Sequence, residues 1–258
     1  IAVNCISDLE LVGHTQLFPL YMYKSIESNM FIDYSKSVTK ITSSSGRQYI
    51  RCLNITEWAV EEYRKHYGER VTEEDIFYYV YGILHSPEYR ERYSNELKKM
   101  LPRIPFVKRT EDFWKFVEAG RKLANLHLNY ETIEPWKIEE INKGNPNDPK
   151  TYEITKMRFG KTPDGKEDRT QIIYNDYITL KGIPLEAYEY IVNGKSPVER
   201  LMERYQKTVD KHSRIENDPN DWLREHNNPR YVLDLLKRVV RVSMETLEIV
   251  KSLPQLDM

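Results

Sequence analysis

Hydrophobic and polar residues alternate in two short segments near the start of the chain. Residues 17–23 (LFPLYMY) and 48–55 (QYIRCLNI) are rich in aromatic and β-branched side chains, which favour β-strands. The segment between them that includes residues 36–47 (KSVTKITSSSGR) is polar and predicts a loop. This part of the sequence therefore predicts two strands before the first helix.

The spacing of apolar residues then changes to a helical period. Residues 56–68 begin with a threonine that can cap a helix and end at a glycine. Residues 72–86 also begin with a threonine that can cap a helix. A proline after residue 86 predicts a third helix over 86–100. Residues 101–106 are predicted to be extended because of their prolines. A fourth helix is predicted over residues 110–128. The apolar residues expected to face the core are Ile76, Val80, Ile83 and Leu84 of the second helix and Phe113, Phe116, Val117, Gly120 and Leu123 of the fourth.

The second half of the chain starts with a Gly/Asn/Pro/Asp connector at residues 142–150. A hairpin is predicted over 151–179, with a turn built from Gly160, Pro163, Asp164 and Gly165. Two helices follow at 184–194 and 196–206, and a loop at 211–222 leads to the longest helix, 229–253. The narrow apolar seam expected on that helix contains Leu235, Val239, Val242, Thr246, Ile249 and Leu253.

These elements predict an α+β fold that is predominantly helical, with a small antiparallel sheet or hairpin and a long C-terminal helix. The 258 residues are enough for one large domain or two small ones. The residue pattern changes after Pro135, which suggests sub-parts at 1–135 and 136–258. The chain starts at Ile1 without a methionine, and we expect it to be a fragment of a longer protein.

Composition narrows the classes of protein that fit. The formal net charge is −1, so a nucleic-acid site would need locally concentrated positive charge. No apolar run approaches 20 residues, which argues against a membrane protein. Cys5 and Cys52 lack the spacing of a zinc site, so we expect reduced thiols, no structural zinc and a cytoplasmic location.

Motifs for nucleotide binding, zinc-dependent hydrolysis and serine hydrolysis are absent from the sequence. The nearest approach to the catalytic turn of amino-methyltransferases is NDPNDW, residues 217–222, where Asn220 replaces a required proline. A capped turn before a helix explains that segment better. His127 lies at the apolar edge of its helix and fits a core residue better than a ligand, and His85 is expected to help end its helix. The sequence therefore predicts no catalytic residues and no metal site in this chain.

The hairpin presents two different faces. Because alternate side chains of a strand share a face, Lys156 and Arg158 point one way and Met157 and Phe159 the other. In the return strand, Ile172, Tyr174, Ile178 and Leu180 share one side. The opposite side carries Arg169, Gln171, Asn175 and Tyr177, interrupted by Ile173. The turn adds Lys161 and Lys166. One face is thus expected to pack on helices and the other to remain polar.

The polar face carries the side chains that proteins use to contact DNA. Arg and Lys donate to guanine, Asn and Gln pair with adenine, and a two-stranded ribbon fits the major groove. The basic loops at 36–47 and 102–109 have a composition that suits phosphate contacts. The alternative for all three segments is a solvated surface, in which the charges only protect strand edges and maintain solubility.

Several long segments together resemble one family. They are ISDLELVGHTQLFPLYMY near the start, DIFYYVYGILHSPEYRERYSNELKKMLPRIPF in the helical half, and MRFGK, QIIYNDYITLKGIPLEAYEYIVNGKSPVERLMERYQ, NDPNDW and RVSMETLEIV in the second half. In this order they are similar to the C-terminal specificity region of single-chain type ISP restriction–modification enzymes. Such enzymes combine a nuclease, a helicase-like translocase, an adenine methyltransferase and a target recognition domain.

The resemblance implies that this chain recognises duplex DNA and directs methylation and cleavage by the methyltransferase and helicase domains of the same polypeptide. S-adenosylmethionine, ATP and Mg²⁺ would be bound by those domains, and this chain would hold no cofactor. We expect phosphate contacts from Lys40, Lys108, Lys156, Lys161 and Lys166, and base contacts from Arg47, Arg158, Arg169, Gln171 and Asn175, with Tyr177 stacking or bonding to phosphate.

Two other functions fit parts of the sequence. The chain could be a structural module that couples the methyltransferase to the helicase without reading DNA, in which case the long helix should expose its apolar seam. It could also be a methyltransferase with a degenerate motif at 217–222.

Overall fold

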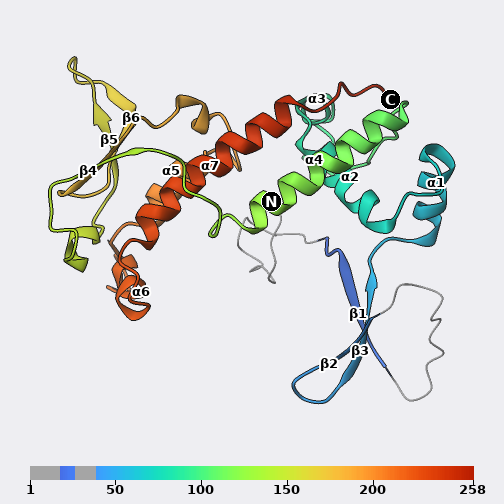
Figure 1. The fold of residues 1–258 in the computed structure, drawn as a ribbon, viewed down its shortest axis with the longest axis horizontal. Helices are drawn as coiled ribbons and strands as arrows, with labels where there is room; N and C mark the ends of the chain where they lie inside the picture. The colour runs from blue at the N-terminus through green and yellow to red at the C-terminus, as the bar shows by residue number, and fades with distance from the viewer. Residues whose placement is uncertain (1–17, 27–38) are drawn as a thin grey trace. The chain divides into compact units, whose positions relative to one another are not determined.

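The computed structural model describes residues 18–26 and 39–258, which belong to two compact units (Figure 1). The first unit contains Ile1–Asn125 and Ser252–Met258, and the second contains Leu126–Lys251. Residue 17 of the first predicted strand, residues 36–38 of the predicted loop and Cys5 lie outside the described residues. The α+β fold class, with small antiparallel sheets and a long C-terminal helix, is confirmed.

The first unit places a three-stranded antiparallel sheet before its helices, with strand order β1-β3-β2. Its elements are β1 (Tyr21–Ser25), β2 (Thr39–Thr42), β3 (Gln48–Leu53), α1 (Glu57–Tyr67), α2 (Glu73–His85), α3 (Pro87–Arg92) and most of α4 (Thr110–Leu128).

Side-chain caps fix the starts of the helices in this unit. Thr56 Oγ1 accepts a hydrogen bond from Ala59 N at 3.3 Å. Thr72 and Asp75 form a capping box, in which each side chain accepts a hydrogen bond from the other residue's backbone. Because these bonds satisfy amide groups that a helix leaves without partners, the predicted starts of α1 and α2 are confirmed.

The core of the first unit is strongly aromatic. Tyr79, Phe113 and Phe116 are fully buried, and Tyr67 stacks on Phe113 with ring centroids 4.1 Å apart. Helices α2 and α4 approach closely at two glycines. A Cβ atom added to Gly120 would lie 1.9 Å from the carbonyl oxygen of Tyr78, and one added to Gly82 would lie 2.3 Å from that of Phe116. The backbones can meet only because both positions lack side chains.

The second unit is built on a four-stranded antiparallel sheet with strand order β4-β7-β6-β5. Its elements are β4 (Glu139–Asn142), the 3₁₀ helix η1 (Pro149–Tyr152), β5 (Arg158–Lys161), β6 (Glu167–Ile173), β7 (Ile178–Lys181), the 3₁₀ helix η2 (Leu185–Tyr188), α5 (Pro197–Arg204), β8 (Thr208–Val209), β9 (Glu216–Asn217), α6 (Pro219–Glu225) and α7 (Tyr231–Lys251).

One side of this sheet forms the core of the second unit with α5, η2 and α7. Ile172, Ile178 and Leu180 are completely buried there. Strand β4 lies at the sheet edge, where Glu140 is bound by helix α7. The two guanidinium nitrogens of Arg230 donate to the Glu140 carboxylate at 3.0 and 2.9 Å, and Lys237 Nζ donates at 2.6 Å. These bonds connect the sheet edge to the long helix.

Helix α7 buries a wider surface than the predicted seam. The predicted residues Leu235, Val239, Val242 and Thr246 are buried, as expected. Val232, Leu233, Leu236, Val240 and Ser243 are buried as well. At 100° per residue these positions cover about half of the helix circumference. The exposed seam that would have favoured a coupling module is therefore not present over these residues.

Several predicted elements were wrong. The loop at 36–47 contains strand β2, which pairs with β3. The helix at 184–194 is a 3₁₀ turn of four residues, η2, followed by irregular structure. The third helix ends at Arg92 instead of residue 100. The loop at 211–222 contains strand β9 and the first residues of α6. Strand β2 forms through its pairing with β3, whereas α6 begins at a local cap, Asp218, followed by a proline.

Candidate nucleic-acid interface

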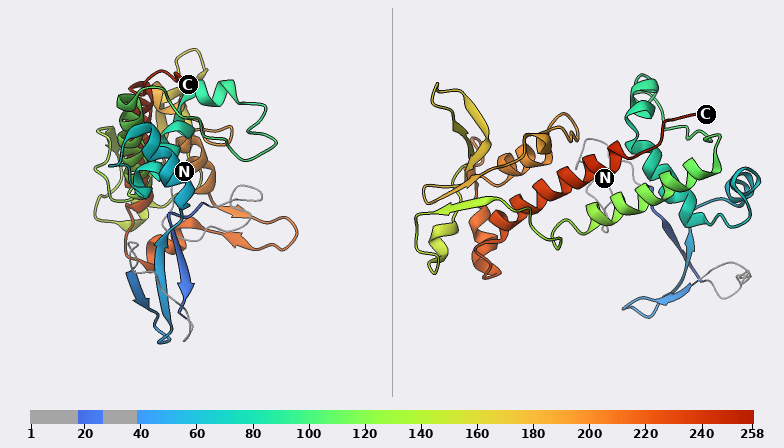
Figure 2. Two further views of the ribbon diagram at one scale, coloured as in Figure 1. Left: turned by 90° about the vertical axis from the view of Figure 1, so that its right-hand side faces the viewer. Right: turned by 45° about the horizontal axis from the view of Figure 1, so that its top comes forward.

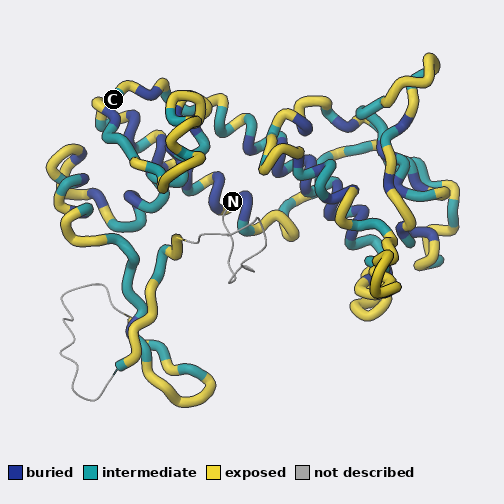
Figure 3. Tube along the Cα trace, turned by 180° about the vertical axis from the view of Figure 1, so that it is seen from behind, coloured by how far each residue is buried: buried dark blue, intermediate teal, exposed yellow. Residues whose placement is uncertain are grey.

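The hairpin between β5 and β6 has the turn that the sequence predicts. Gly165 N donates to Thr162 O at 2.9 Å, and Thr162 N donates to Lys166 O at 2.9 Å. Gly165 has φ +83°, a conformation that glycine adopts without strain. The turn is exposed to solvent (Figure 3). Met157 is buried, whereas Lys156 and Arg158 are exposed, so the predicted separation of faces in this strand is confirmed.

Three positive side chains on β5 or just before it have no ion-pair or hydrogen-bond partner within the described ranges. They are Lys156, Arg158 and Lys161, and all three are exposed. The neighbouring acids are engaged elsewhere: Asp164 binds Thr162 and Lys166, and Asp168 accepts hydrogen bonds from Thr170 and Gln171. Glu167, opposite Lys161 on β6, is bonded to Arg169. Residues 156–161 therefore present three exposed cations that are paired with none of these acids.

Arg169 and Gln171 lie on the same hairpin but are already bonded. Arg169 Nε lies 2.9 Å from Glu167 Oε1, and its Nη2 lies 3.0 Å from Glu199 Oε1. The hydrogen bond with Glu167 raises the pKa of Arg169. The guanidinium also covers the Phe159 and Tyr188 rings. Gln171 Nε2 donates to Asp168 Oδ2 at 2.6 Å.

Asn175 divides what the sequence predicts as one return strand. Its Oδ1 accepts from the amides of Tyr177 and Ile178 at 2.9 and 2.8 Å, and its Nδ2 donates to the carbonyls of Thr151 and Glu153 at 2.8 and 2.9 Å. The continuous strand is therefore wrong: β6 ends at Ile173, the chain turns, and β7 returns beside it. Tyr177 lies in this turn and is 50% exposed.

The remaining predicted residues belong to the first unit. Lys40 lies on β2, in a cross-strand row with Ile50 of β3 and Lys24 of β1. Arg47 is exposed in the turn before β3, beside Gly46. Lys108 Nζ lies 2.7 Å from Asp257 Oδ1, and both side chains are largely exposed. Sequence reasoning missed Lys24, whose place opposite Lys40 depends on the pairing of both outer strands with β3.

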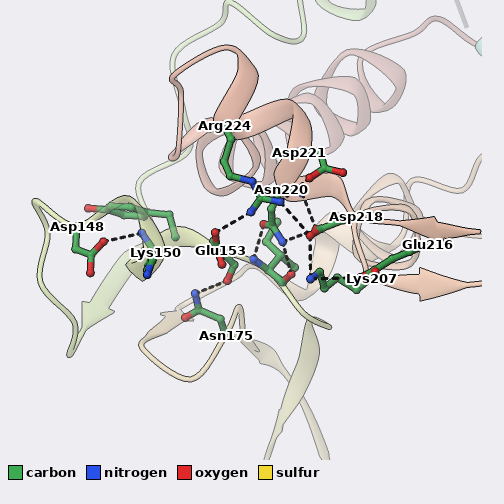
Figure 4. Close-up of polar contacts among 12 residues, drawn as sticks. Asp148, Lys150, Glu153, Asn175, Lys207, Glu216, Asp218, Asn220, Asp221 and Arg224 are labelled. Atoms are coloured by element: carbon green, nitrogen blue, oxygen red, sulfur yellow. Dashed lines mark hydrogen bonds and ion pairs between the residues drawn. The ribbon is translucent and has the colours of Figure 1, made fainter.

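The segment 217–222 has a structural role in the second unit (Figure 4). Asp218 caps helix α6. Asn220 is 1% exposed, and its amide group bonds both Ile154 N and Ile154 O at 2.8 Å. Although burial alone would raise it, hydrogen bonds from Lys207 and the Asn220 amide lower the pKa of Asp218 to about 2. The capped turn is confirmed, and Asp218, the polar residue of the degenerate motif, is bonded to Lys207, Arg224 and the Asn220 backbone amide.

The two histidines that the sequence singles out are structural. His127 is buried, with Nε2 3.0 Å from Thr246 Oγ1. His85 is the last residue of α2 and contacts the Tyr81 carbonyl at 2.8 Å through Nδ1. Burial lowers the pKa of His85 to about 4. The described residues contain no group of His, Cys, Asp and Glu side chains placed to hold a metal ion, and none of their helices combines the length and hydrophobicity needed to cross a bilayer.

Comparison with solved structures gives relatives of substantial sequence identity. The ATP-dependent Type ISP restriction-modification enzyme LlaBIII bound to DNA matches with a TM-score of 0.72 and 34% identity, over 93% of this chain and 14% of that one. A nuclease-deletion mutant of the Type ISP enzyme LlaGI, in complex with a DNA substrate mimic, gives 0.65 and 40%, over 83% of this chain and 16% of that one.

A DrdV–DNA complex gives a TM-score of 0.67 and 30% identity, over 83% of this chain and 22% of that one. The chain thus spans a minor part of each of these proteins. A search of curated protein sequences found no match. The family model described as the Type ISP C-terminal specificity domain matches residues 1–235. Because that match covers most of the chain, the chain belongs to the type ISP C-terminal specificity domain family.

Proposed function

We propose that this chain recognises a duplex DNA sequence and thereby directs adenine methylation and translocation-coupled cleavage by a type ISP restriction–modification enzyme. The observation that carries the proposal is the family match over residues 1–235, since relatives at 30–40% identity are described as bound to DNA or to a DNA mimic. Catalysis, and with it S-adenosylmethionine, ATP and Mg²⁺, is assigned to neighbouring domains of that enzyme.

The three exposed cations at residues 156–161 support a direct role in DNA contact. Lys156 and Lys161 are compact charges suited to phosphate, whereas the planar guanidinium of Arg158 can bond the two acceptors of guanine in the major groove. Phosphate contacts then fix the register of the domain, and base contacts supply sequence information. Lys166 and Lys108 contribute phosphate contacts if DNA displaces their exposed carboxylate partners.

Base contact is assigned first to Arg158 and to Arg47, whose side chains are exposed. Arg169, Gln171 and Asn175 would have to exchange the hydrogen bonds described above for bonds to a base. Each such exchange reduces the free energy gained on binding DNA, because the former hydrogen-bond partner within the protein is left unsatisfied. Tyr177 is assigned to a stacking or phosphate contact, and Lys40 to a phosphate contact.

Replacement of Arg158 by alanine tests the role of the hairpin. We expect affinity for the recognised sequence to fall about 10- to 100-fold, because a bidentate base contact supplies about 1–3 kcal/mol. Arg158→Lys is the matched control, since it keeps the charge and loses the planar fork; it should retain binding to random DNA and lose discrimination. Fluorescence anisotropy on cognate and random duplexes measures both. If neither variant alters affinity or discrimination, the hairpin is scaffold.

The proposed function is tested by exchanging this region for the corresponding region of LlaGI in the full-length enzyme. Sequencing of modified bases in genomic DNA from cells carrying each enzyme then gives the methylated motif. We expect the motif to change completely to that of the donor, because selectivity moves with the exchanged region. An active chimaera that methylates the original motif would show that another part of the enzyme reads the DNA.

A further inference from the structure

The hairpin formed by β8 and β9 is an exposed arm of the second unit. Residues 207–217 are all exposed, and the left-hand view of Figure 2 shows this hairpin, in orange, projecting from the rest of its unit. The strands pair Thr208 with Asn217 and Val209 with Glu216. Val209 is 55% exposed and the adjacent Ile215 is 69% exposed. An apolar pair this accessible on so short a hairpin requires an explanation.

The turn of this arm has a defined conformation. Asp210 N donates to Ile215 O at 2.9 Å, and Arg214 N donates to Asp210 O at 3.0 Å. The Asp210 carboxylate accepts from the amides of His212 and Ser213 at 3.0 and 2.7 Å, and from the Ser213 hydroxyl at 2.9 Å. The only acid of the turn is therefore occupied by the turn itself.

Arg214 adopts a backbone conformation that glycine would adopt more easily. Its φ is +60°, which costs a residue with a Cβ atom about 1–2 kcal/mol. Strain of this kind is retained where a side chain has a use that glycine cannot supply. Arg214, Lys211 and His212 have no ion pair or side-chain hydrogen bond within the ranges that the structure describes, so the turn carries two cations, Lys211 and Arg214, against the single carboxylate of Asp210.

The base of the arm adjoins the basic strand of the candidate interface. Lys207 N donates to Thr155 O at 2.9 Å, next to the unpaired Lys156. Three residues separate Lys207 from Lys211, so four steps at the rise of a strand give a span of at most about 13 Å. This length is comparable with the width of the DNA major groove, about 12 Å. Lys207 itself is paired with Glu216 and Asp218. Lys156, beside the base of the arm, and Lys211, at its turn, can therefore contact phosphates of one duplex.

We propose that the β8–β9 turn is a second DNA-contact element, in which Lys211 and Arg214 bind backbone phosphates of the duplex that Lys156 contacts. Val209 and Ile215 cover apolar sugar and base edges beside those phosphates. The choice of DNA over a protein partner rests on charge, since the two cations of the turn outnumber its one carboxylate, which is held by the amides of the turn itself. This inference rests on the proposed function and adds a contact site outside the β5–β6 hairpin.

The test uses the full-length enzyme, a short duplex of random sequence, and the dependence of the binding constant on salt concentration. Lys211→Ala and Arg214→Gly are each expected to reduce the slope of log K against log salt by about one unit, because each phosphate contact releases about one counterion. Arg214→Gly should leave the melting temperature unchanged or raise it, since glycine relieves the backbone strain. A lower salt slope together with an unchanged melting temperature would show that the replaced side chain contacts DNA and that its loss does not unfold the protein.

Asn193→Gly is the matched control. Asn193 is also exposed with a positive φ, +50°, so this change relieves similar strain without removing a charge, and the salt slope should not change. If wild-type enzyme binds the duplex and the Lys156→Ala/Lys161→Ala variant lowers the slope while Lys211→Ala and Arg214→Gly do not, the second contact element is wrong and the arm is left for a protein partner. If the wild-type enzyme binds no duplex, the proposed function and this inference fail together.

Discussion

Replacement of Gly120 by alanine is expected to destabilise the first unit by about 3 kcal/mol, the upper part of the range for overpacked cores. The added methyl group would lie 1.9 Å from the Tyr78 carbonyl oxygen and 3.0 Å from Gly82 N. Both atoms belong to the backbone of α2, so no side-chain rotation can make room. Helix α2 must move away from α4, and the aromatic core between them loses contacts.

The sign of this effect is informative because helix propensity predicts the opposite. Inside a helix, alanine is favoured over glycine by about 1 kcal/mol. Differential scanning calorimetry of the variant should show a melting temperature lower by roughly 10 °C for a unit of this size. Gly46→Ala is the control, since Gly46 has φ +76° with open space around it, and strain alone should cost about 1 kcal/mol there. A stabilised Gly120→Ala variant would contradict the close approach of α2 and α4.

Local sequence chemistry predicts the helices of the first unit and the β5–β6 turn. Thr56 and Thr72 cap their helices through their own side chains, and Gly165 supplies the positive φ of the turn. In each case the residue and the group it satisfies are a few positions apart. Spacing along the chain is then enough to identify the contact.

Contacts between distant residues explain what the sequence could not predict. Asn175 turns the chain between β6 and β7 because its amide also holds Thr151 and Glu153, more than 20 positions earlier in the sequence. The same limit applies to the candidate site. Arg169 and Arg158 look equivalent in the sequence, yet Glu199 of α5 binds Arg169 and leaves Arg158 exposed. Which cations are available to DNA is therefore decided by tertiary pairing.

Replacement of Glu140 by glutamine is expected to destabilise the second unit by about 3 kcal/mol at neutral pH, the lower end of the range for breaking a buried ion pair. The Lys237 side chain is only 12% exposed, so loss of the carboxylate leaves its charge largely buried without compensation. Edge strand β4 would separate from α7 first, and β4–β7 amides should exchange hydrogen faster in the variant. Glu118→Gln is the control, since the Glu118–Lys122 pair is exposed and should contribute little.

The same cluster predicts how the second unit responds to acid. Hydrogen bonds from Arg230, followed by those from Lys237, lower the pKa of Glu140 to about 2 from an ordinary value of 4.5. A depressed carboxyl pKa stabilises the folded state above the unfolded pKa, and this contribution is lost as pH falls from about 5 to 2. The shift corresponds to about 3 kcal/mol, so the wild-type unit should lose that amount over this interval, while Glu140→Gln should lose correspondingly less. Urea unfolding followed across this pH range measures the difference, and parallel curves for the two proteins would show that Glu140 titrates normally.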